Sequence, residues 1–226
     1  MWMGDNFNEM LEADGSVRPH YAILHKWLET QTPANLRAKI REAESIFRRL
    51  GITFAVYGTE EASERLIPFD IIPRIFAASE WRRLEAGIAQ RVGALNAFID
   101  DVYHRQEIVR AGKVPAELIL QNEAYLPQMA GHSPARNVYS HIIGTDIVRV
   151  GENEFYVLED NCRTPSGVSY MLESREMMMR MFPDLFRENR IEPVDNYPEK
   201  LRRTLASVAP IKCERDPTVV ILTPGH

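Results

Sequence analysis

Two runs of β-forming residues, separated by a short turn, constrain this chain more than any other feature. The runs cover residues 138–150 and 155–159, and the four residues between them read Gly-Glu-Asn-Glu. Glycine and asparagine in a short connection between two such runs are typical of a tight hairpin turn. The sequence therefore predicts an antiparallel hairpin in this part of the chain.

The turn also predicts which residues face each other. If the hairpin closes on residues 151–154, Val150 lies opposite Phe155, and counting outward places Asp146 opposite Glu159. Directly opposed side chains lie about 4.5–5.5 Å apart at Cβ. Two carboxylates at that distance repel each other unless a positive charge lies between them.

A divalent cation is the simplest positive charge for this place. The same count puts Gly144 opposite Asn161, on the face that carries Asp146 and Glu159. Hard cations such as Mg²⁺ take carboxylate and amide oxygens, so we expect Asp146, Glu159 and Asn161 to form a metal site. The alternative is a solvated, charged hairpin whose acidic residues have no ligand.

Strand alternation separates the neighbouring polar residues into two groups. Asp160 falls on the opposite face with Thr145 and Arg149, which excludes it as a metal ligand. Arg163 returns to the metal face one step further along. Its planar cation is suited to a phosphate or an acyl phosphate.

The segment after Arg163 has the composition of a ligand-binding loop. Gly167 allows the backbone to approach a ligand closely, and Ser166 or Ser169 can cap the following helix, whose free N–H groups suit an anion. A plain turn from strand to helix has the same composition, so both interpretations stay open. In that helix, residues 171–182 include several methionines, which we expect to fill the core.

The rest of the sequence predicts helices with few strands. Residues before 21 form an irregular polar arm, and Ser79 caps a long helix that begins at Glu80 and stops near Gly112. Residues 65–76 contain Pro68 and Pro73 and are not a regular helix. We expect further helices at residues 21–28, 34–50 and 197–208, a strand at residues 52–57, and a buried strand at residues 217–223.

Composition limits the class of protein. The 226 residues, 45% of them hydrophobic, suffice for one core or for one domain and part of another, and the net charge of −5 argues against general nucleic-acid binding. Cys162 and Cys213 lie far apart and form no metal-ligand spacing. No secretion signal or membrane span is present, so a soluble cytoplasmic protein is expected.

Several stretches resemble one enzyme family. Glu159-Asp160-Asn161-Cys162-Arg163 resembles the E-x-N-x-R metal motif of ATP-grasp ligases, and Asp146 falls where those enzymes carry their other acidic ligand. The stretches RLIPFDIIPRIF, ALNAFIDDVY and EDNCRTPSGVSYMLESR resemble the circularly permuted ATP-grasp type 2 family, relatives of the glutathionylspermidine synthase group. The resemblance covers nearly the whole chain.

This resemblance implies an ATP-dependent ligase that joins a carboxylate to an amine through an acyl phosphate. Asp146, Glu159 and Asn161 would hold Mg²⁺ on the ATP phosphates, and Arg163 would steady the acyl phosphate. It also implies a phosphate- or substrate-facing role for Arg74 and favours ligand contact by the Ser166–Gly167 turn. For Arg74, the alternative is an ion pair that holds a proline-rigid loop.

The implied fold is α+β. We expect an N-terminal arm with helices at residues 1–50, and a permuted ATP-grasp subdomain at 51–210 with an antiparallel sheet packed by helices. The first strand of a following α/β domain is expected at 211–226. The family continues into a second half that holds adenine and triphosphate, so the chain resembles the first part of a larger ligase.

Two other functions stay open. The chain could be a catalytically incomplete fragment that acts as a binding module or as one half of a split enzyme, since an apolar strand at residues 219–222 would offer a docking edge. A hydrolase using Cys162 or Ser166 is a weaker hypothesis, because the sequence positions no histidine near either residue.

Overall fold

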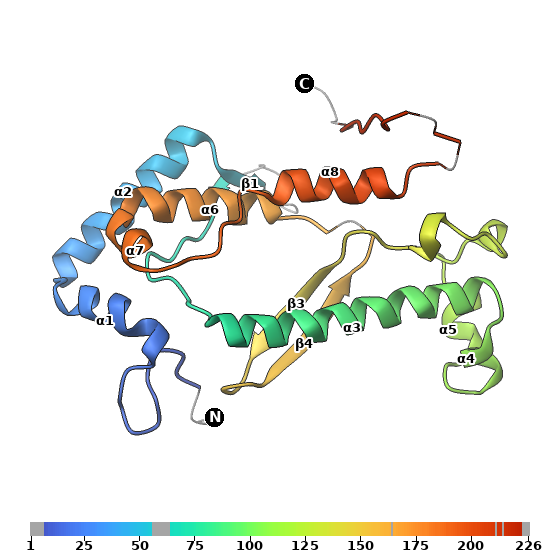
Figure 1. The fold of residues 1–226 in the computed structure, drawn as a ribbon, viewed down its shortest axis with the longest axis horizontal. Coiled ribbons are helices and arrows are strands. Elements are labelled where there is room, and N and C mark those ends of the chain that lie inside the picture. Colours follow the sequence, from blue (N-terminus) through green and yellow to red (C-terminus); the bar gives the residue numbers. More distant parts are fainter. Residues whose placement is uncertain (1–6, 56–63, 164, 211, 214, 223–226) are drawn as a thin grey trace. The chain divides into compact units, whose positions relative to one another are not determined.

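The computed structural model describes residues 7–55, 64–163, 165–210, 212–213 and 215–222 and combines helices with short strands (Figure 1). The chain forms two compact units, each built from non-contiguous segments. Unit 1 comprises Met1–Trp81, Arg149–Tyr156 and Ser166–Asp195, and unit 2 comprises Arg82–Val148, Val157–Pro165 and Asn196–His226.

The described residues form a series of helices and two pairs of strands. The helices are η1 (Pro19–Tyr21), α1 (Ala22–Glu29), α2 (Pro33–Leu50), α3 (Ala78–Tyr103), α4 (Glu107–Arg110), α5 (Ala116–Leu120), η2 (Pro127–Met129), η3 (Ala135–Asn137), α6 (Val168–Met181), α7 (Pro183–Glu188) and α8 (Tyr197–Ser207). The strands are β1 (Thr53–Ala55), β2 (Glu64–Leu66), β3 (Gly144–Arg149) and β4 (Phe155–Asn161). They pair as β1 with β2 and as β3 with β4.

Helices α1 and α2 confirm the prediction from sequence periodicity. Thr32 caps α2 by accepting a hydrogen bond from the backbone N–H of Asn35 at 3.2 Å. Gly51 ends the helix with a left-handed φ of 67°. Both signals act within a few residues, which is why the sequence predicts this helix well.

The core of unit 1 lies among α1, α2, α6 and α7 (Figure 1). Its most buried side chains are Leu24, Phe47 and Met177. The methionines of α6 divide between core and surface: three are buried, whereas Met171 and Met179 are exposed. Among these methionines the expected core role is therefore confirmed for Met177, Met178 and Met181, and it is confirmed for Phe182 as well.

From residue 7 on, the N-terminal segment is largely irregular, as predicted, but its end is not a surface arm. Leu11 and Val17 form an antiparallel bridge, and Arg18 and Tyr21 are buried. The hydroxyl of Tyr21 accepts a hydrogen bond from the backbone N–H of Ile75 at 2.8 Å. This segment is therefore folded onto unit 1 by contacts distant in sequence.

Helix α3 begins and ends earlier than predicted. It starts at Ala78, so Ser79 lies inside the first turn, and the Glu80 carboxylate accepts a hydrogen bond from the backbone N–H of Ala77 at 2.9 Å. The helix ends at Tyr103, and Gln106, with a left-handed φ of 52°, precedes the short helix α4.

The predicted hairpin is confirmed, but its strands are shorter on one side and irregular in register. Strand β3 begins at Gly144, so residues 138–143 are not part of it. At the turn, the N–H of Val150 donates to the carbonyl of Glu154 at 3.0 Å. The predicted pairing of Val150 with Phe155 is therefore wrong by one residue.

The far end of the hairpin keeps the predicted register. Thr145 Oγ1 donates to Asp160 Oδ1 at 2.9 Å. From these two contacts we infer that β4 holds one residue more than β3 between this pair and the turn, as in a β-bulge. The alternation of exposure in β4 breaks where Leu158 and Glu159 are both exposed, and we place the bulge there.

Two further strand predictions have different outcomes. Strand β1 lies within the predicted strand at residues 52–57, whose last two residues are outside the described part of the chain. The buried strand predicted at residues 217–223 is wrong for 217–222, which form no strand; Ile221 and Leu222 are 88% and 92% exposed. Within the described residues, no strand pairs with this run.

Helix α8 confirms the helix predicted at residues 197–208. Within the described part of the chain, no helix has both the length and the apolar character that crossing a bilayer requires.

Candidate functional site

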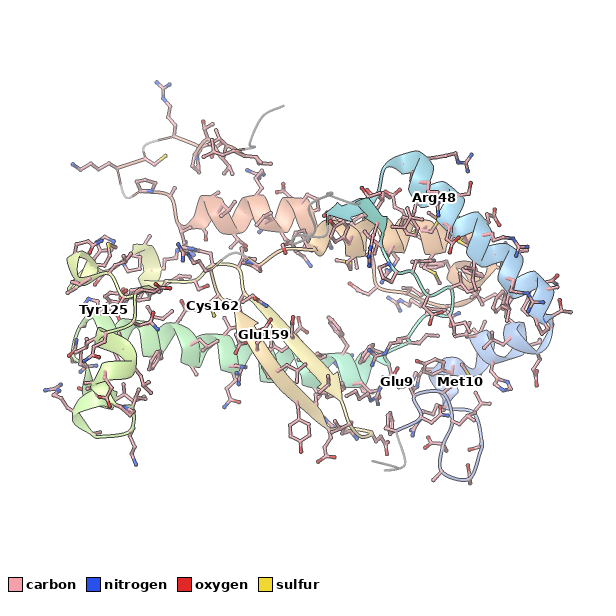
Figure 2. The ribbon with its side chains drawn as sticks, turned by 180° about the vertical axis from the view of Figure 1, so that it is seen from behind. Glu9, Met10, Arg48, Tyr125, Glu159 and Cys162 are labelled. Atoms are coloured by element: carbon pink, nitrogen blue, oxygen red, sulfur yellow. The ribbon has the colours of Figure 1, made fainter. Side chains whose placement is uncertain are left out.

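The predicted metal residues lie on the part of the hairpin that belongs to unit 2. Asp146 on β3 and Glu159 and Asn161 on β4 all have exposed side chains, and Glu159 is labelled in Figure 2. The Asn161 amide N–H₂ donates to Glu159 Oε1 at 3.3 Å and to the carbonyl of Gly144 at 3.4 Å. The structure thus brings Glu159 and Asn161 together.

The chemistry of these side chains fits a hard cation. Because the Asn161 nitrogen faces Glu159 and Gly144, its Oδ1 stays available as a neutral oxygen ligand. The described residues contain no group of three or more His, Cys, Asp or Glu side chains that could hold a metal ion. Two carboxylates and an amide leave positions for water and phosphate, as Mg²⁺ prefers, and the assignment stays a prediction.

Asp160 occupies the other face of the hairpin, as expected. It accepts hydrogen bonds from Thr145 and from Arg91 of α3, whose Nε and Nη2 lie 2.7 and 2.6 Å from Asp160 Oδ2. The Arg91 guanidinium holds the pKa of this carboxyl below its ordinary value. Asp160 is therefore an ionised anchor between β4 and α3.

A second anchor from α3 holds the segments on either side of the hairpin. Asn96 Oδ1 accepts hydrogen bonds from the backbone N–H groups of Tyr139 and Ser140 at 2.8 and 3.0 Å. Ser140 Oγ in turn donates to the carbonyl of Cys162 at 2.5 Å. These contacts fix the chain before β3 to the chain after β4.

The thiol of Cys162 is not activated by this environment. Burial raises its pKa, and the nearby Asp160 carboxylate raises it further. A cysteine nucleophile needs a lowered pKa, so the structure does not support a hydrolase built on Cys162.

A hydrogen-bonded row links Asp100 of α3 to His104, just after the helix, and to Ser133 and Tyr139 of the following loop. Ser133 Oγ lies 3.2 Å from His104 Nε2, and His104 Nδ1 lies 3.4 Å from Asp100 Oδ1, an order found in serine hydrolases. His104 Nδ1 lies closer, at 2.9 Å, to the backbone carbonyl of Asp100, while the carboxylate accepts from Tyr139 at 2.7 Å. Burial and this bond raise the pKa of Tyr139 to about 12. We interpret the row as a clamp on the loop.

Arg163 lies outside β4, so strand alternation does not predict which way its side chain faces. Strand β4 ends at Asn161, so Arg163 sits in a bend with an exposed side chain. Alternation along the strand does not extend to it, and its role at an acyl phosphate stays a prediction.

The remaining predicted residues belong to unit 1. Arg74 Nε donates to Glu9 Oε2 at 2.7 Å, and its Nη2 bonds the other oxygen of the same carboxylate. The structure therefore shows the alternative considered for Arg74, an ion pair that holds a proline-rigid loop. Its phosphate-binding role stays a prediction.

The turn before α6 differs in one respect from the prediction. Gly167 is the N-cap, with a left-handed φ of 92°, and no side chain caps the helix, so a cap by Ser166 or Ser169 is wrong. The glycine is needed for its backbone conformation. Contact of Ser166 and Gly167 with a nucleotide stays a prediction.

Arg149 in unit 1 was not predicted to have a special place. Its side chain is 2% exposed, and its Nη2 bonds Glu80 Oε1 at 2.5 Å. The guanidinium lies 4.4 Å from the ring centre of Phe7 and 5.4 Å from that of Phe155. Local sequence gives no signal for this network, because Glu80 is distant in the chain.

Comparison with known proteins identifies the family. Residues 73–226 match the family model described as "A circularly permuted ATPgrasp". An uncharacterised protein of Synechocystis sp. is 44% identical over 98% of this chain and 46% of its own length. One of Mycobacterium tuberculosis is 43% identical over 97% of this chain and 39% of its own length.

A further relative, from Frankia casuarinae, bears the name "Putative glutamate--cysteine ligase 2-2". It is 36% identical over 97% of this chain and 25% of its own length. The chain thus spans less than half the length of these relatives. The family match covers more than half of the chain and confirms the resemblance seen in its sequence motifs: the chain belongs to the circularly permuted ATP-grasp family.

Proposed function

We propose that this chain carries the metal-binding part of an ATP-dependent ligase that joins a carboxylate to an amine. Membership of the ATP-grasp family supports the use of ATP. The observation that carries the proposal is the pairing of Glu159 with Asn161 on the exposed face of β4. Oxygen ligands on an open strand face suit an ion that must also bind phosphate.

Asp146, Glu159 and Asn161 would hold Mg²⁺. When bound, Mg²⁺ would neutralise charge on the ATP phosphates, which is the main requirement of phosphoryl transfer. Asp160 acts as a positioning residue, because its bonds to Arg91 hold the opposite face of β4. The exposed Arg163 guanidinium would bind an acyl phosphate by paired hydrogen bonds.

The reaction has two steps. A substrate carboxylate oxygen attacks the γ-phosphorus of ATP, and ADP leaves. The amine nitrogen then attacks the acyl carbon, phosphate leaves, and the nitrogen loses a proton to give the amide. The name of the Frankia relative makes glutamate and cysteine the first substrate pair to test.

The experiment measures ADP release and amide formation by mass spectrometry. The chain, joined to the second half that the family carries, is incubated with Mg-ATP, glutamate and cysteine, and compared with Glu159→Gln and with Glu154→Gln, a control in the turn of the same hairpin. We expect product from the wild type and from Glu154→Gln, and none from Glu159→Gln. Wild-type turnover by Glu159→Gln would contradict the proposal.

A second candidate function is a binding module or one half of a split enzyme. The exposed apolar run Val219, Val220, Ile221 and Leu222 favours it, because such a run can dock on a partner. Calorimetry with Mg-ATP separates the two functions. Binding by the chain alone supports a self-sufficient nucleotide site, and binding only after a partner fragment is added supports the split enzyme.

A further inference from the structure

A shallow cavity of about 570 Å³, widely open to solvent, lies on unit 1 beside the N-terminal segment. Its volume is in the range of small-molecule sites. Figure 2 labels two residues of its wall, Glu9 and Met10. The charged residues of the wall are Glu9, Asp70, Arg74 and Arg149.

The charged groups of this wall balance one another. Arg74 and Arg149 are cationic, and Glu9 and Asp70 are anionic. The Arg74 hydrogen bond holds the pKa of Glu9 below its ordinary value, so this carboxylate is ionised at neutral pH. The cavity therefore presents two charges of each sign on one wall.

Arg149 has a hydrogen-bonding group without an acceptor. Its Nε donates to the carbonyl of Gly151 at 3.1 Å, and its Nη2 donates to Glu80 and to the carbonyl of Glu152. Its Nη1 is buried and has no hydrogen-bond partner among the described residues; the nearest carboxylate oxygen, Glu9 Oε1, lies 3.8 Å away. A buried charged donor without an acceptor is costly, so an added oxygen here would be bound favourably.

Arg74 offers a second donor in the same cavity. Glu9 engages its Nε and Nη2, and its side chain is 63% exposed. The planar guanidinium is thus held in place by Glu9, while its remaining nitrogen can meet a ligand oxygen. Two arginines held in this way can donate hydrogen bonds to the two oxygens of one carboxylate.

We propose that this cavity binds a free α-amino acid with an apolar side chain. The ligand carboxylate accepts from Arg74 and Arg149, and its ammonium donates to Asp70 and Glu9. The apolar side chain packs against the uncharged part of the wall, which includes Phe7, Met10, Tyr21, Ile72 and Pro73.

The balance of charge excludes the simpler ligands. A phosphate would add about two negative charges to a wall that already has as many acidic as basic groups, and Glu80 adds another carboxylate next to Arg149. Asp70 Oδ1 accepts a hydrogen bond from the backbone N–H of Ile72 at 2.9 Å, and a carboxylate without an amine would leave the charge of Asp70 without a cationic partner. A zwitterion satisfies both signs, and this inference does not depend on the proposed ligase activity.

Calorimetry with four probes tests the ligand class. L-leucine carries both charges. 4-Methylpentanoate lacks the amine, and 3-methylbutylamine lacks the carboxylate. Inorganic phosphate is an anion that lacks both the amine and the apolar side chain. We expect saturable leucine binding to the 226-residue chain and at least about tenfold weaker binding of the other three, which corresponds to one lost charged interaction. Absence of saturable leucine binding at millimolar concentration would overturn the proposal, as would equal or tighter binding of any other probe.

A matched pair of variants tests the place of binding. Arg74→Gln should weaken leucine binding at least about tenfold. Arg202→Gln is the control, because Arg202 makes the same two-point pair with Glu199 and does not line the cavity. Circular dichroism checks that both variants are folded, and unchanged leucine affinity in Arg74→Gln would contradict the proposed site.

Arg149 is better tested without substitution, since it also holds unit 1 together. In the wild-type protein with ¹⁵N-labelled arginine, leucine should shift the side-chain resonances of Arg149 and leave those of Arg202 unchanged. Binding of leucine without a shift at Arg149 would place the ligand elsewhere and overturn the assignment.

Discussion

The Arg91 guanidinium and the Asp160 carboxylate join α3 to β4 through contacts of 2.6 and 2.7 Å. Thr145 of β3 bonds the other oxygen of the same carboxylate. One side chain thus connects three elements of unit 2. Because neighbouring residues of a strand point to opposite faces, this anchor leaves Glu159 and Asn161 on the exposed face.

This pair predicts a dependence of stability on pH. The Arg91 hydrogen bond lowers the pKa of Asp160 in the folded protein. A lowered pKa stabilises the fold above the pKa of the unfolded chain, about 3.9, and the contribution is lost as pH falls through the folded value. Below about pH 4, we expect the free energy of unfolding to fall more steeply in the wild type than in Asp160→Asn. Urea unfolding across this range measures the free energy of unfolding of both proteins. Parallel pH dependences of the two would contradict the prediction.

Removal of the buried guanidinium should destabilise unit 1. Arg149→Met leaves Glu80, whose side chain is 12% exposed, without its cationic partner. We expect a loss of about 3–5 kcal/mol in the free energy of unfolding, the usual effect of breaking a buried pair on one side. Arg202→Met removes an exposed pair and is the control, with little change expected. Chemical denaturation measures both, and equal stability of the two variants would count against the buried network.

Glycine substitutions should have opposite effects at two positions. Gly167 has a φ of 92°, and a Cβ added there would lie 3.8 Å from Tyr170 Cδ2, an ordinary contact, so Gly167→Ala introduces backbone strain of about 1–2 kcal/mol without a steric clash. Gly93 lies inside α3 with nothing within 4 Å of an added Cβ, so Gly93→Ala should stabilise by about 0.5–1 kcal/mol. Thermal unfolding distinguishes the two signs, and stabilisation by Gly167→Ala would refute the turn geometry.

The two cysteines should differ in reactivity. Burial raises the pKa of Cys162, whereas Cys213 is exposed. Because the thiolate is the reactive form, iodoacetamide at neutral pH should modify Cys213 first and Cys162 much more slowly. Intact-mass time courses of Cys213→Ser and Cys162→Ser separate the two sites. Faster modification of Cys162 would show an activated thiol and revive the hydrolase hypothesis.

Features set by neighbouring residues could be predicted from the sequence. Helix α2 has its cap at Thr32 and its stop at Gly51, and both signals lie beside the helix. The hairpin turn is equally local. The bulge at Leu158 and Glu159 was missed, because the turn residues do not show where a strand takes up an extra residue.

Features that depend on distant partners could not be predicted. Glu9 and Arg74 are 65 residues apart, and no local pattern relates them. The Asp100–His104–Ser133 row likewise requires a loop that returns to α3. The apolar run ending at Leu222 has the composition of a strand, but a strand also needs a partner, and no described strand pairs with it. For the candidate site, the sequence indicated which residues take part, and the resemblance to the family indicated what each of them does.

Titration with Mn²⁺, followed by electron paramagnetic resonance, tests the metal site most directly. Mn²⁺ prefers the same oxygen ligands as Mg²⁺. The wild type and Glu154→Gln should bind one Mn²⁺ with similar affinity, and Glu159→Gln should bind it at least about tenfold more weakly, a change of about 1.4 kcal/mol. Equal Mn²⁺ affinity in Glu159→Gln and the wild type would contradict a metal site on the exposed face of β4.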